Sequence, residues 1–327
     1  MSKKKVAFLV PSKKPCGVNR YSKMLLSEIS ALSKNLDISK TYFDQCNNPT
    51  YYFNLARKLS ATYDLIHIQH EFSLFGKWGN GFFWFLLGIN KPLIVTFHEF
   101  HVGLVGTKEK LLLFLLKVKI SKVIVLSKEA EKLAEHIFCS SKIINTGFGV
   151  KKQKITKFSK RLVVHPGFIR PNKNQLFTVE LARSLPEFSF ILAGEGKGEY
   201  FERVLAKANN VPNISIKTGL SDKEYSNLIS KSKFVVLPYT SVVQSAVFFE
   251  ALSMNKKIVA SNLTFFKDFS QKKLLVTSKL EVNSFANILR KNLFPKKIDD
   301  YIKRFNNTNS IQIVASRNVE VYIKELS

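Results

Sequence analysis

Cysteine is scarce in this chain. Only three cysteines occur among 327 residues, and Cys16, Cys46 and Cys139 lie far apart in the sequence. Three isolated thiols form neither the disulfide framework of a small secreted domain nor the paired spacing of a structural zinc site. Because nothing in this pattern requires an oxidising compartment, we expect a cytoplasmic protein.

Long hydrophobic runs are also absent. The longest apolar stretches, 81–89 and 111–116, fall short of the ~18–20 residues that a helix needs to cross a bilayer. Three lysines precede the apolar segment 6–10, as in a signal peptide, but that segment is short and no small-residue cleavage site follows it. We therefore interpret residues 6–10 as a first β-strand.

Acidic residues are outnumbered by basic ones, 24 to 51, which gives a formal net charge of +27. A charge of this size indicates anionic partners, such as nucleic acid, a lipid surface or phosphorylated substrates. The lysines are spread along the whole chain, with no separate basic tail and no recognisable basic-aromatic module, so we do not expect nucleic-acid binding. A lysine-rich source organism is a second explanation for part of the charge.

The composition, 45% hydrophobic and 12% aromatic, is that of a globular protein, and the length suits two domains. The first half of the chain alternates continuous apolar runs with segments of helical spacing. Such runs are typical of strands buried on both faces of a parallel sheet. We expect strands at 6–10, 65–68, 93–97 and 123–126 and one beginning at 143, with helices at 21–32 and, capped by Ser127, at 128–138.

A second strand–helix series fills the rest of the chain. Its expected strands are 161–164, 188–193, 214–217, 234–237 and 257–260, and its expected helices are 175–184, 199–208, 221–230 and 245–254. We therefore predict an α/β fold with two doubly wound, Rossmann-like domains facing a cleft. The domains are expected at 1–150 and 160–300, joined at 147–160, with a C-terminal helix at about 308–327 returning to the first domain.

The segment HPGFIRPNKNQ, 165–175, places two cations in a Gly/Pro loop directly after a strand. Guanidinium and ammonium groups such as Arg170 and Lys173 neutralise phosphate oxygens. Glu250 lies on a helix that follows a later strand, and a carboxylate there can accept hydrogen bonds from ribose hydroxyls. These residues suit a nucleotide diphosphate. The alternative is a polar turn and a solvated helix face.

Two helix starts offer further anion sites. Gly17, between the first strand and its helix, lets the backbone approach a phosphate, although it also suits an ordinary turn. Ser245 and Ala246 begin the helix that carries Glu250, where free N–H groups can bind an anion. The Gly17 loop is not a G-x-G-x-x-G fingerprint, so a simple NAD-binding domain is not favoured.

Histidines and glutamates follow two neighbouring strands. His67, His70 and Glu71 occur in IHIQHEF, and His98, Glu99 and His101 in TFHEFH. We expect His70, Glu71 and His98 at one cleft rim, where they could hold sugar hydroxyls or, as an alternative, zinc. The chain has neither a helical H-E-x-x-H motif nor an Asp-x-Asp pair, so we expect no metal.

Several blocks, taken in order, resemble the GT-B glycosyltransferases, specifically the retaining glycosyltransferase family 4. They are PCGVNRY, IHIQHEFSLFG, KPLIVTFHEF, GFIRPNKN, LAGEG, LPY with QSAVFFEAL, and the closing segment 310–326, and they span nearly the whole chain. The resemblance implies that Gly17 approaches the donor diphosphate and that His98 lines the sugar site. It also implies that Arg170 and Lys173 hold the diphosphate and that Glu250 binds ribose.

The chain departs from the family pattern at three positions. Phe168 stands where the arginine is commoner, Asn174 replaces a usual glycine, and Val242 replaces the first glutamate of the Glu-x7-Glu motif. Gln244 and Ser245 are similar to a variant loop of some members, which implies a donor-binding role. The missing glutamate bears on which donor sugar is recognised and on whether the protein is active.

The resemblance implies a glycosyltransferase that moves a sugar from a nucleotide diphosphate sugar to a glycan or lipid-linked acceptor, with retention and without a cofactor or metal. A sugar-nucleotide epimerase of the same fold is one alternative, because fold does not fix chemistry. A non-catalytic glycan-binding partner subunit is another, since one glutamate is missing.

The last prediction concerns membrane association. Residues 108–122 form an apolar stripe bounded by lysines, and 76–91 include Trp78, Trp84 and three phenylalanines. Lysines and exposed aromatic rings would together support reversible binding to an anionic leaflet at the cytoplasmic face of a membrane. The alternative is that both segments are core helices.

Overall fold

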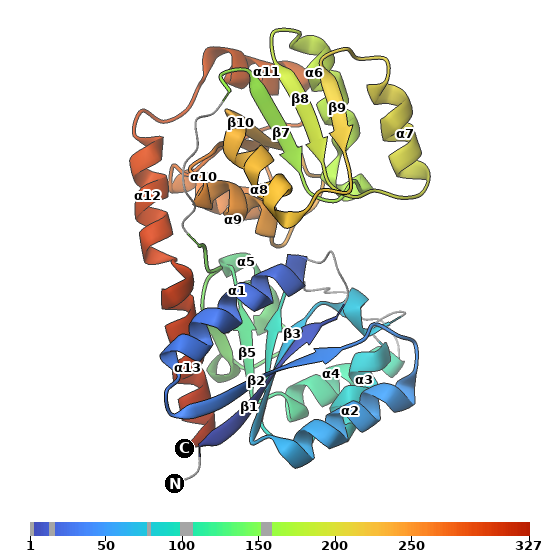
Figure 1. Ribbon diagram of the computed structural model, residues 1–327, viewed down its shortest axis with the longest axis vertical. Helices are drawn as coiled ribbons and strands as arrows, with labels where there is room; N and C mark the ends of the chain where they lie inside the picture. Colours follow the sequence, from blue (N-terminus) through green and yellow to red (C-terminus); the bar gives the residue numbers. More distant parts are fainter. Residues whose placement is uncertain (1–2, 13–16, 77–79, 99–106, 152–158) are drawn as a thin grey trace. The chain divides into compact units, whose positions relative to one another are not determined.

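A computed structural model describes residues 3–12, 17–76, 80–98, 107–151 and 159–327 (Figure 1). The chain divides into two compact units, one made of 1–149 with 309–327 and the other of 150–308. Cys16, Trp78, Glu99 and His101, and residues 152–158 of the expected junction at 147–160, lie outside the described residues.

The first unit contains a six-stranded parallel sheet in the order β2-β1-β3-β4-β5-β6. Val6 to Val10 and all of β3 are buried, as expected for strands covered on both faces. The strands are β1 (Lys4–Pro11), β2 (Leu36–Phe43), β3 (Leu65–His70), β4 (Leu93–Phe97), β5 (Lys122–Val125) and β6 (Ile143–Asn145).

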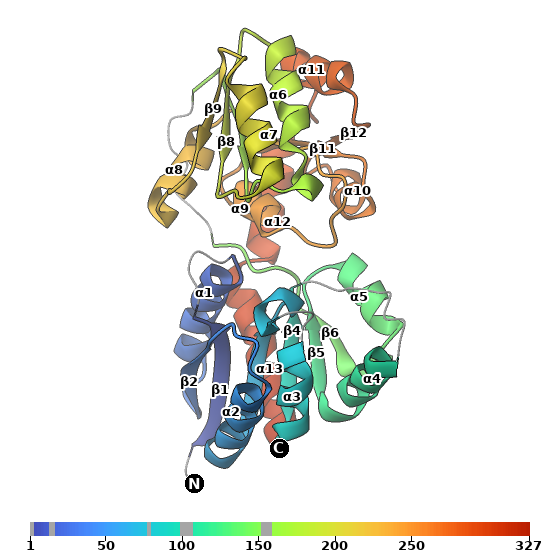
Figure 2. The same ribbon diagram turned by 90° about the vertical axis from the view of Figure 1, so that its right-hand side faces the viewer.

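Helices cover both faces of this sheet (Figures 1 and 2). They are α1 (Gly17–Leu32), α2 (Pro49–Thr62), α3 (Asn80–Gly88), α4 (Thr107–Lys119), α5 (Lys128–Glu135) and α13 (Ile311–Leu326), with short turns η1 (Phe72–Phe75) and η3 (Ser140–Lys142). The C-terminal helix α13 belongs to this unit and packs against α1. Its first turn is capped by the Ser310 hydroxyl, which accepts the Ile313 N–H.

The sequence-based expectation for the first unit includes neither β2 nor α2. The edge strand β2 has only one buried residue, so its sequence, LDISKTYF, lacks the continuous apolar run of an inner strand. Helix α2 follows it, with Asn48 as N-cap and Pro49 at its first position. The Ser127 cap of α5 is confirmed, but α5 ends at Glu135, earlier than expected.

The second unit contains another six-stranded parallel sheet, ordered β12-β11-β10-β7-β8-β9. The strands are β7 (Leu162–Pro166), β8 (Ser189–Ala193), β9 (Ile214–Lys217), β10 (Phe234–Leu237), β11 (Lys257–Ser261) and β12 (Val276–Ser278). Two parallel sheets confirm the predicted α/β class with two Rossmann-like domains.

The helices of the second unit divide between the two faces of its sheet. They are η4 (Pro171–Lys173), α6 (Gln175–Ser184), α7 (Glu199–Ala208), α8 (Asp222–Lys231), α9 (Ala246–Ser253), α10 (Thr264–Gln271), α11 (Val282–Lys291) and α12 (Ile298–Thr308). Helix α6 packs against α7 and α11 on one face, and right-handed crossovers put α8, α9 and α10 on the other (Figure 2).

Each sheet has one place where the strand order changes direction. In the first unit it lies between β1 and β3, and in the second between β7 and β10. Ligands of open α/β sheets bind beyond the carboxyl ends of the strands at such switch points. The loops that follow these four strands are therefore where a ligand is expected.

His165 is a titratable group inside the core of the second unit. It lies on β7, is 1% exposed, and its Nδ1 atom is 2.8 Å from the Thr178 hydroxyl oxygen. Burial, and secondarily the charge of Lys173, lower the pKa of His165 to about 3. The folded protein therefore keeps this ring neutral at a pH where the unfolded chain protonates it.

We expect this histidine to make folding sensitive to acid. Its folded pKa lies below its unfolded value, so its contribution is complete above about pH 6.5 and falls as the pH drops towards 3. Between pH 7 and 5, wild type should lose about 2 kcal/mol more unfolding free energy than His165→Asn. Urea unfolding followed by far-ultraviolet circular dichroism measures the difference, and equal losses in both proteins would contradict it.

Candidate functional site

The loop after β7 is shaped by two glycines. Gly167 has φ +116° and donates its N–H to the Ala193 carbonyl at 2.8 Å. Gly194 has φ +151°, and a Cβ atom there would collide with the Gly167 carbonyl group. Both positions therefore require glycine, and the loops after β7 and β8 pack backbone against backbone.

Lys173 links this loop to the loop after β10. Its Nζ atom lies 3.7 Å from the centre of the buried Tyr239 ring. The Thr240 N–H also donates to the Asn172 carbonyl at 3.0 Å. A backbone hydrogen bond and a cation–π contact thus join the two loops at the switch point and fix the position of the ammonium group.

Arg170 lies at the exposed side of the same loop. Its guanidinium group is 4.7 Å from the centre of the Phe168 ring, so it stacks on the residue that occupies the commoner arginine position. The buried Gln175 side chain fixes the backbone between them, because it donates to the Phe168 carbonyl at 3.0 Å and accepts the Arg170 N–H at 3.3 Å. Asn174, with φ 59°, adopts the left-handed conformation that a glycine would favour.

Gln244, Ser245 and Ala246 lie at the start of α9, in the loop that follows β10. The Ser245 hydroxyl accepts the Phe248 N–H at 3.3 Å and so caps the helix. The Gln244 Oε1 atom is buried and has no hydrogen-bond partner within the described part of the chain. A buried amide oxygen without a partner is costly, so it favours a ligand that donates a hydrogen bond.

Glu250 lies one turn further along α9 and is partly buried. Its Oε1 atom accepts a hydrogen bond of 3.0 Å from the Ser226 hydroxyl on α8. A carboxylate has about four acceptor positions, and this number suits the paired hydroxyls of a ribose. Val242, where the family has its first glutamate, lies in the preceding loop, and its side chain is partly exposed.

In the first unit, Gly17 is the exposed first residue of α1, and an added Cβ would meet no atom within 4 Å. The Asn19 side chain donates to the Pro11 carbonyl and so ties the start of α1 to the end of β1. One turn after Gly17, the Tyr21 ring meets the His98 ring edge to face, with 5.5 Å between centres. The sequence-predicted Gly17 and His98 thus lie at the same edge of the sheet.

His98 follows β4, and its Nε2 atom lies 2.9 Å from the Gln69 Oε1 atom on β3. Burial lowers the pKa of His98 to about 3, so the ring is neutral at physiological pH. The expectation that His70 shares this rim is wrong. Its ring is fully buried among Phe75, Phe82 and Phe97 and belongs to the core.

Three residues of these sites were not singled out from the sequence. Tyr239 supports Lys173, Gln175 fixes the Arg170 loop, and Gln69 contacts His98. A signal existed for Gln69, because it is a polar residue on a strand that is buried along its whole length, and a buried polar side chain needs a partner. No group of three or more potential metal ligands occurs among the described residues.

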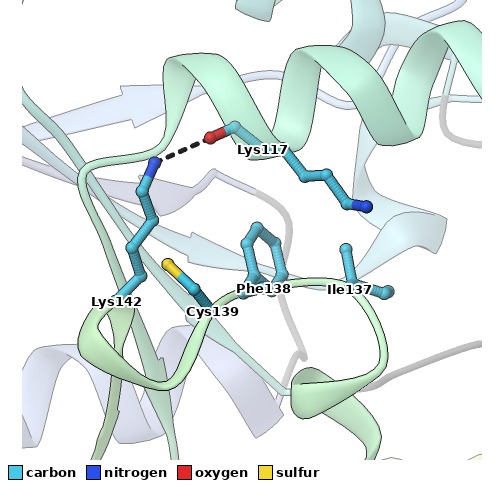
Figure 3. A pocket seen from close by; sticks show the side chains of 5 residues that line it. All are labelled: Lys117, Ile137, Phe138, Cys139 and Lys142. Atoms are coloured by element: carbon cyan, nitrogen blue, oxygen red, sulfur yellow. Dashed lines mark hydrogen bonds between the residues drawn. The ribbon is translucent and has the colours of Figure 1, made fainter.

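A separate hollow of about 290 Å³ lies beside α4 and η3 (Figure 3). Lys117, Ile137, Phe138, Cys139 and Lys142 line it. Lys142 donates to the Lys117 and Ile120 carbonyls at 2.7 Å and so caps the C-terminal end of α4. These residues precede β5 and β6, at the edge of the sheet opposite to the predicted site residues.

Three solved structures have the same fold. A glycosyltransferase from Rickettsia africae has a TM-score of 0.75 at 15% identity and covers 100% of both chains. HepE from Anabaena, in complex with UDP and glucose, has a TM-score of 0.75 at 15% identity, covering 98% of this chain and 100% of that one. Sucrose-phosphate synthase from Thermosynechococcus elongatus has a TM-score of 0.74 at 14% identity, covering 98% and 99%.

The sequence comparison identifies the second unit. Residues 149–304 match the family model described as glycosyl transferases group 1. No curated protein matches the chain by sequence. The matched residues contain both loops of the β7/β10 switch point, with Arg170, Lys173 and Glu250. From this match and the two parallel six-stranded sheets, we conclude that the chain is a glycosyltransferase of the GT-B fold.

Proposed function

We propose that this glycosyltransferase moves a sugar from a nucleotide diphosphate sugar to a glycan or lipid-linked acceptor, with retention at the anomeric carbon. The observation that carries the proposal is the pair of cations, Arg170 and Lys173, held in the loop after β7 at the β7/β10 switch point. HepE, which has the same fold, is in complex with UDP and glucose, and this supports a nucleotide-sugar donor here.

The chemistry follows from the charges. As the bond to the sugar breaks, negative charge grows on the leaving diphosphate, and Arg170 and Lys173 stabilise it. Neither cation needs to reorganise, because Lys173 is held over Tyr239 and Arg170 is stacked on Phe168. The Ser245–Ala246 helix start adds N–H groups that can bind the diphosphate. With these cations supplied by side chains, we propose that the reaction needs no metal.

Nucleoside diphosphate release tests this function. The protein is incubated with a panel of uridine, guanosine and adenosine diphosphate sugars, with an added glycan or water to accept the sugar, and with and without EDTA. We propose release from at least one donor, unchanged by EDTA. Conversion of the sugar without release would favour the epimerase alternative, and binding without either reaction would favour the glycan-binding subunit. Loss of release in EDTA with recovery in manganese would contradict the metal-free mechanism.

Lys173 is expected to contribute most directly to donor binding. Lys173→Ala removes one charge-assisted contact and should weaken nucleoside diphosphate binding by about 1.5–3 kcal/mol. Lys207→Ala is the matched control, because Lys207 is an exposed lysine on α7 and lies outside the switch-point loops. Isothermal titration calorimetry measures both variants. Equal affinities in the two folded proteins would contradict the assignment.

Glu250 and Val242 should differ in importance. Glu250→Ala removes an acceptor for ribose and should weaken nucleotide-sugar binding by about 1–3 kcal/mol, whereas Val242→Ala should change it little. Because Glu250 also accepts from Ser226, Ser226→Ala controls for that contact between α8 and α9. The ribose role requires a larger loss in Glu250→Ala than in Ser226→Ala, as measured by competition with labelled nucleotide.

The outer side of α4 supports the membrane part of the proposal. Leu112, Leu115 and Leu116 are buried, but Leu111, Phe114 and Val118 are 48%, 59% and 59% exposed at i, i+3 and i+7 spacing. Trp84 and Leu87 of the adjacent α3 are also exposed. We call these five residues the α3–α4 apolar surface. No helix among the described residues is long and apolar enough to span a membrane.

The flanking charge favours an anionic lipid surface over other partners. Lys110 and Lys117 are exposed on α4, and each lysine near an anionic leaflet contributes about 1 kcal/mol at low salt. Phe114 and Val118 would insert among the headgroups while the lysines contact phosphate. We therefore propose that the enzyme works at the cytoplasmic face of a membrane, where a lipid-linked acceptor lies.

Vesicle sedimentation checks this surface. Wild type should bind phosphatidylglycerol vesicles at low salt, release them at high salt and ignore phosphatidylcholine vesicles. A Phe114→Ser, Val118→Ser double variant should bind severalfold more weakly. Leu293→Ser is the control, because Leu293 is 46% exposed and lies in the second unit. No binding of wild type to anionic vesicles at low salt would remove the membrane proposal.

A further inference from the structure

Behind His98 lies a chain of buried polar side chains from three elements. The His98 Nε2 atom is 2.9 Å from Gln69 Oε1, and Gln69 Nε2 is 3.2 Å from His67 Nε2. His67 Nδ1 contacts the Tyr322 hydroxyl of α13, and its Nε2 atom lies 2.7 Å from the Thr96 hydroxyl. Gln69, His67, Thr96 and Tyr322 are each 0% exposed.

The two polar atoms of Gln69 determine which group donates and which accepts in each hydrogen bond of this chain. The amide oxygen only accepts, so the His98 nitrogen opposite it must carry the proton. The amide nitrogen only donates, so the His67 Nε2 atom must be bare, and the proton of His67 lies on Nδ1 and is donated to Tyr322. A neutral histidine with its proton on Nε2 has an unprotonated Nδ1 atom, and this atom therefore accepts hydrogen bonds.

The surroundings keep both rings neutral. His98 faces Tyr21 on α1 and Gln69 on β3, and burial lowers the pKa values of His98 and His67 to about 3. The His98 ring is partly exposed, and no described residue forms a hydrogen bond with its Nδ1 atom. His98 thus presents one acceptor atom and no charge to a ligand.

We propose that Gln69 and His67 are positioning residues that hold His98 with its proton on Nε2, so that Nδ1 accepts a hydrogen bond from a hydroxyl of the bound sugar. That the ligand is a sugar rests on the proposed function. That the His98 proton lies on Nε2 rests on the buried chain of hydrogen-bonded side chains. It also implies specificity, because a bare nitrogen accepts from a sugar hydroxyl but repels a carboxylate at the same position.

Nitrogen NMR of ring-labelled histidine tests which nitrogen of His98 carries the proton, and the measurement does not depend on enzyme activity. The His98 signals are identified by their loss in His98→Gln. In wild type we expect a protonated Nε2 and a bare Nδ1. Gln69→Met removes both hydrogen bonds with little change in volume, and the two His98 nitrogens should then show averaged shifts from mixed tautomers. Tyr322→Phe should disturb the His67 signals more than those of His98.

Kinetics of nucleoside diphosphate release test the consequence. Gln69→Met should lower kcat/KM about tenfold through loss of the oriented acceptor. Asn318→Leu is the matched control, because Asn318 is buried on the same helix as Tyr322 and, among the described residues, donates to the Val314 carbonyl one turn earlier. This control should keep both the His98 signals and the rate close to those of wild type.

The outcomes separate the two proposals. A wild-type His98 with its proton on Nδ1, or unchanged His98 signals in Gln69→Met, would overturn the positioning role even in an active enzyme. The expected signals in a protein that releases no nucleoside diphosphate from any donor would support the positioning role and overturn the proposed function. Equal rate losses in Gln69→Met and Asn318→Leu would reduce Gln69 to a packing residue and overturn the inference.

Discussion

The backbone hydrogen bond from the Thr240 N–H to the Asn172 carbonyl is the contact on which the proposed donor site depends. It joins the loops after β7 and β10, which come from strands paired side by side at the switch point. Because the loops are held together, Lys173 remains over the Tyr239 ring. A cation fixed before the ligand arrives stabilises a leaving phosphate without reorganisation, which is the usual source of electrostatic catalysis.

In the first unit, the His98 side chain is oriented by a different kind of contact. His98 is not placed by a loop–loop contact but by the hydrogen-bonded chain through Gln69 and His67 to Tyr322. The last member lies on α13, which returns to this unit from the far end of the chain. Docking of the C-terminal helix and orientation of the His98 ring are therefore linked, because buried polar groups need all their partners at once.

The departures from the family pattern have local structural explanations. Asn174 adopts the left-handed conformation of the usual glycine, which asparagine tolerates better than most residues. Arg170 stacks on Phe168 and so lies over the residue that takes the commoner arginine position. Val242 has no such replacement for its missing carboxylate, although Gln244 brings a buried amide oxygen to the same loop.

The sequence by itself determined the elements whose signals are local. Apolar runs identified the inner strands, and Ser127 marked the start of a helix, since burial and capping depend on neighbours in the chain. Arg170 and Lys173 were predicted as site residues because they lie in the loop that follows a strand. Only the tertiary structure decided that His70 packs among phenylalanines, that Glu250 contacts α8, and that His67 meets Tyr322 across 255 positions. Such contacts depend on the order of the strands and on where each helix packs. A local sequence pattern therefore does not predict which distant side chain a residue will contact.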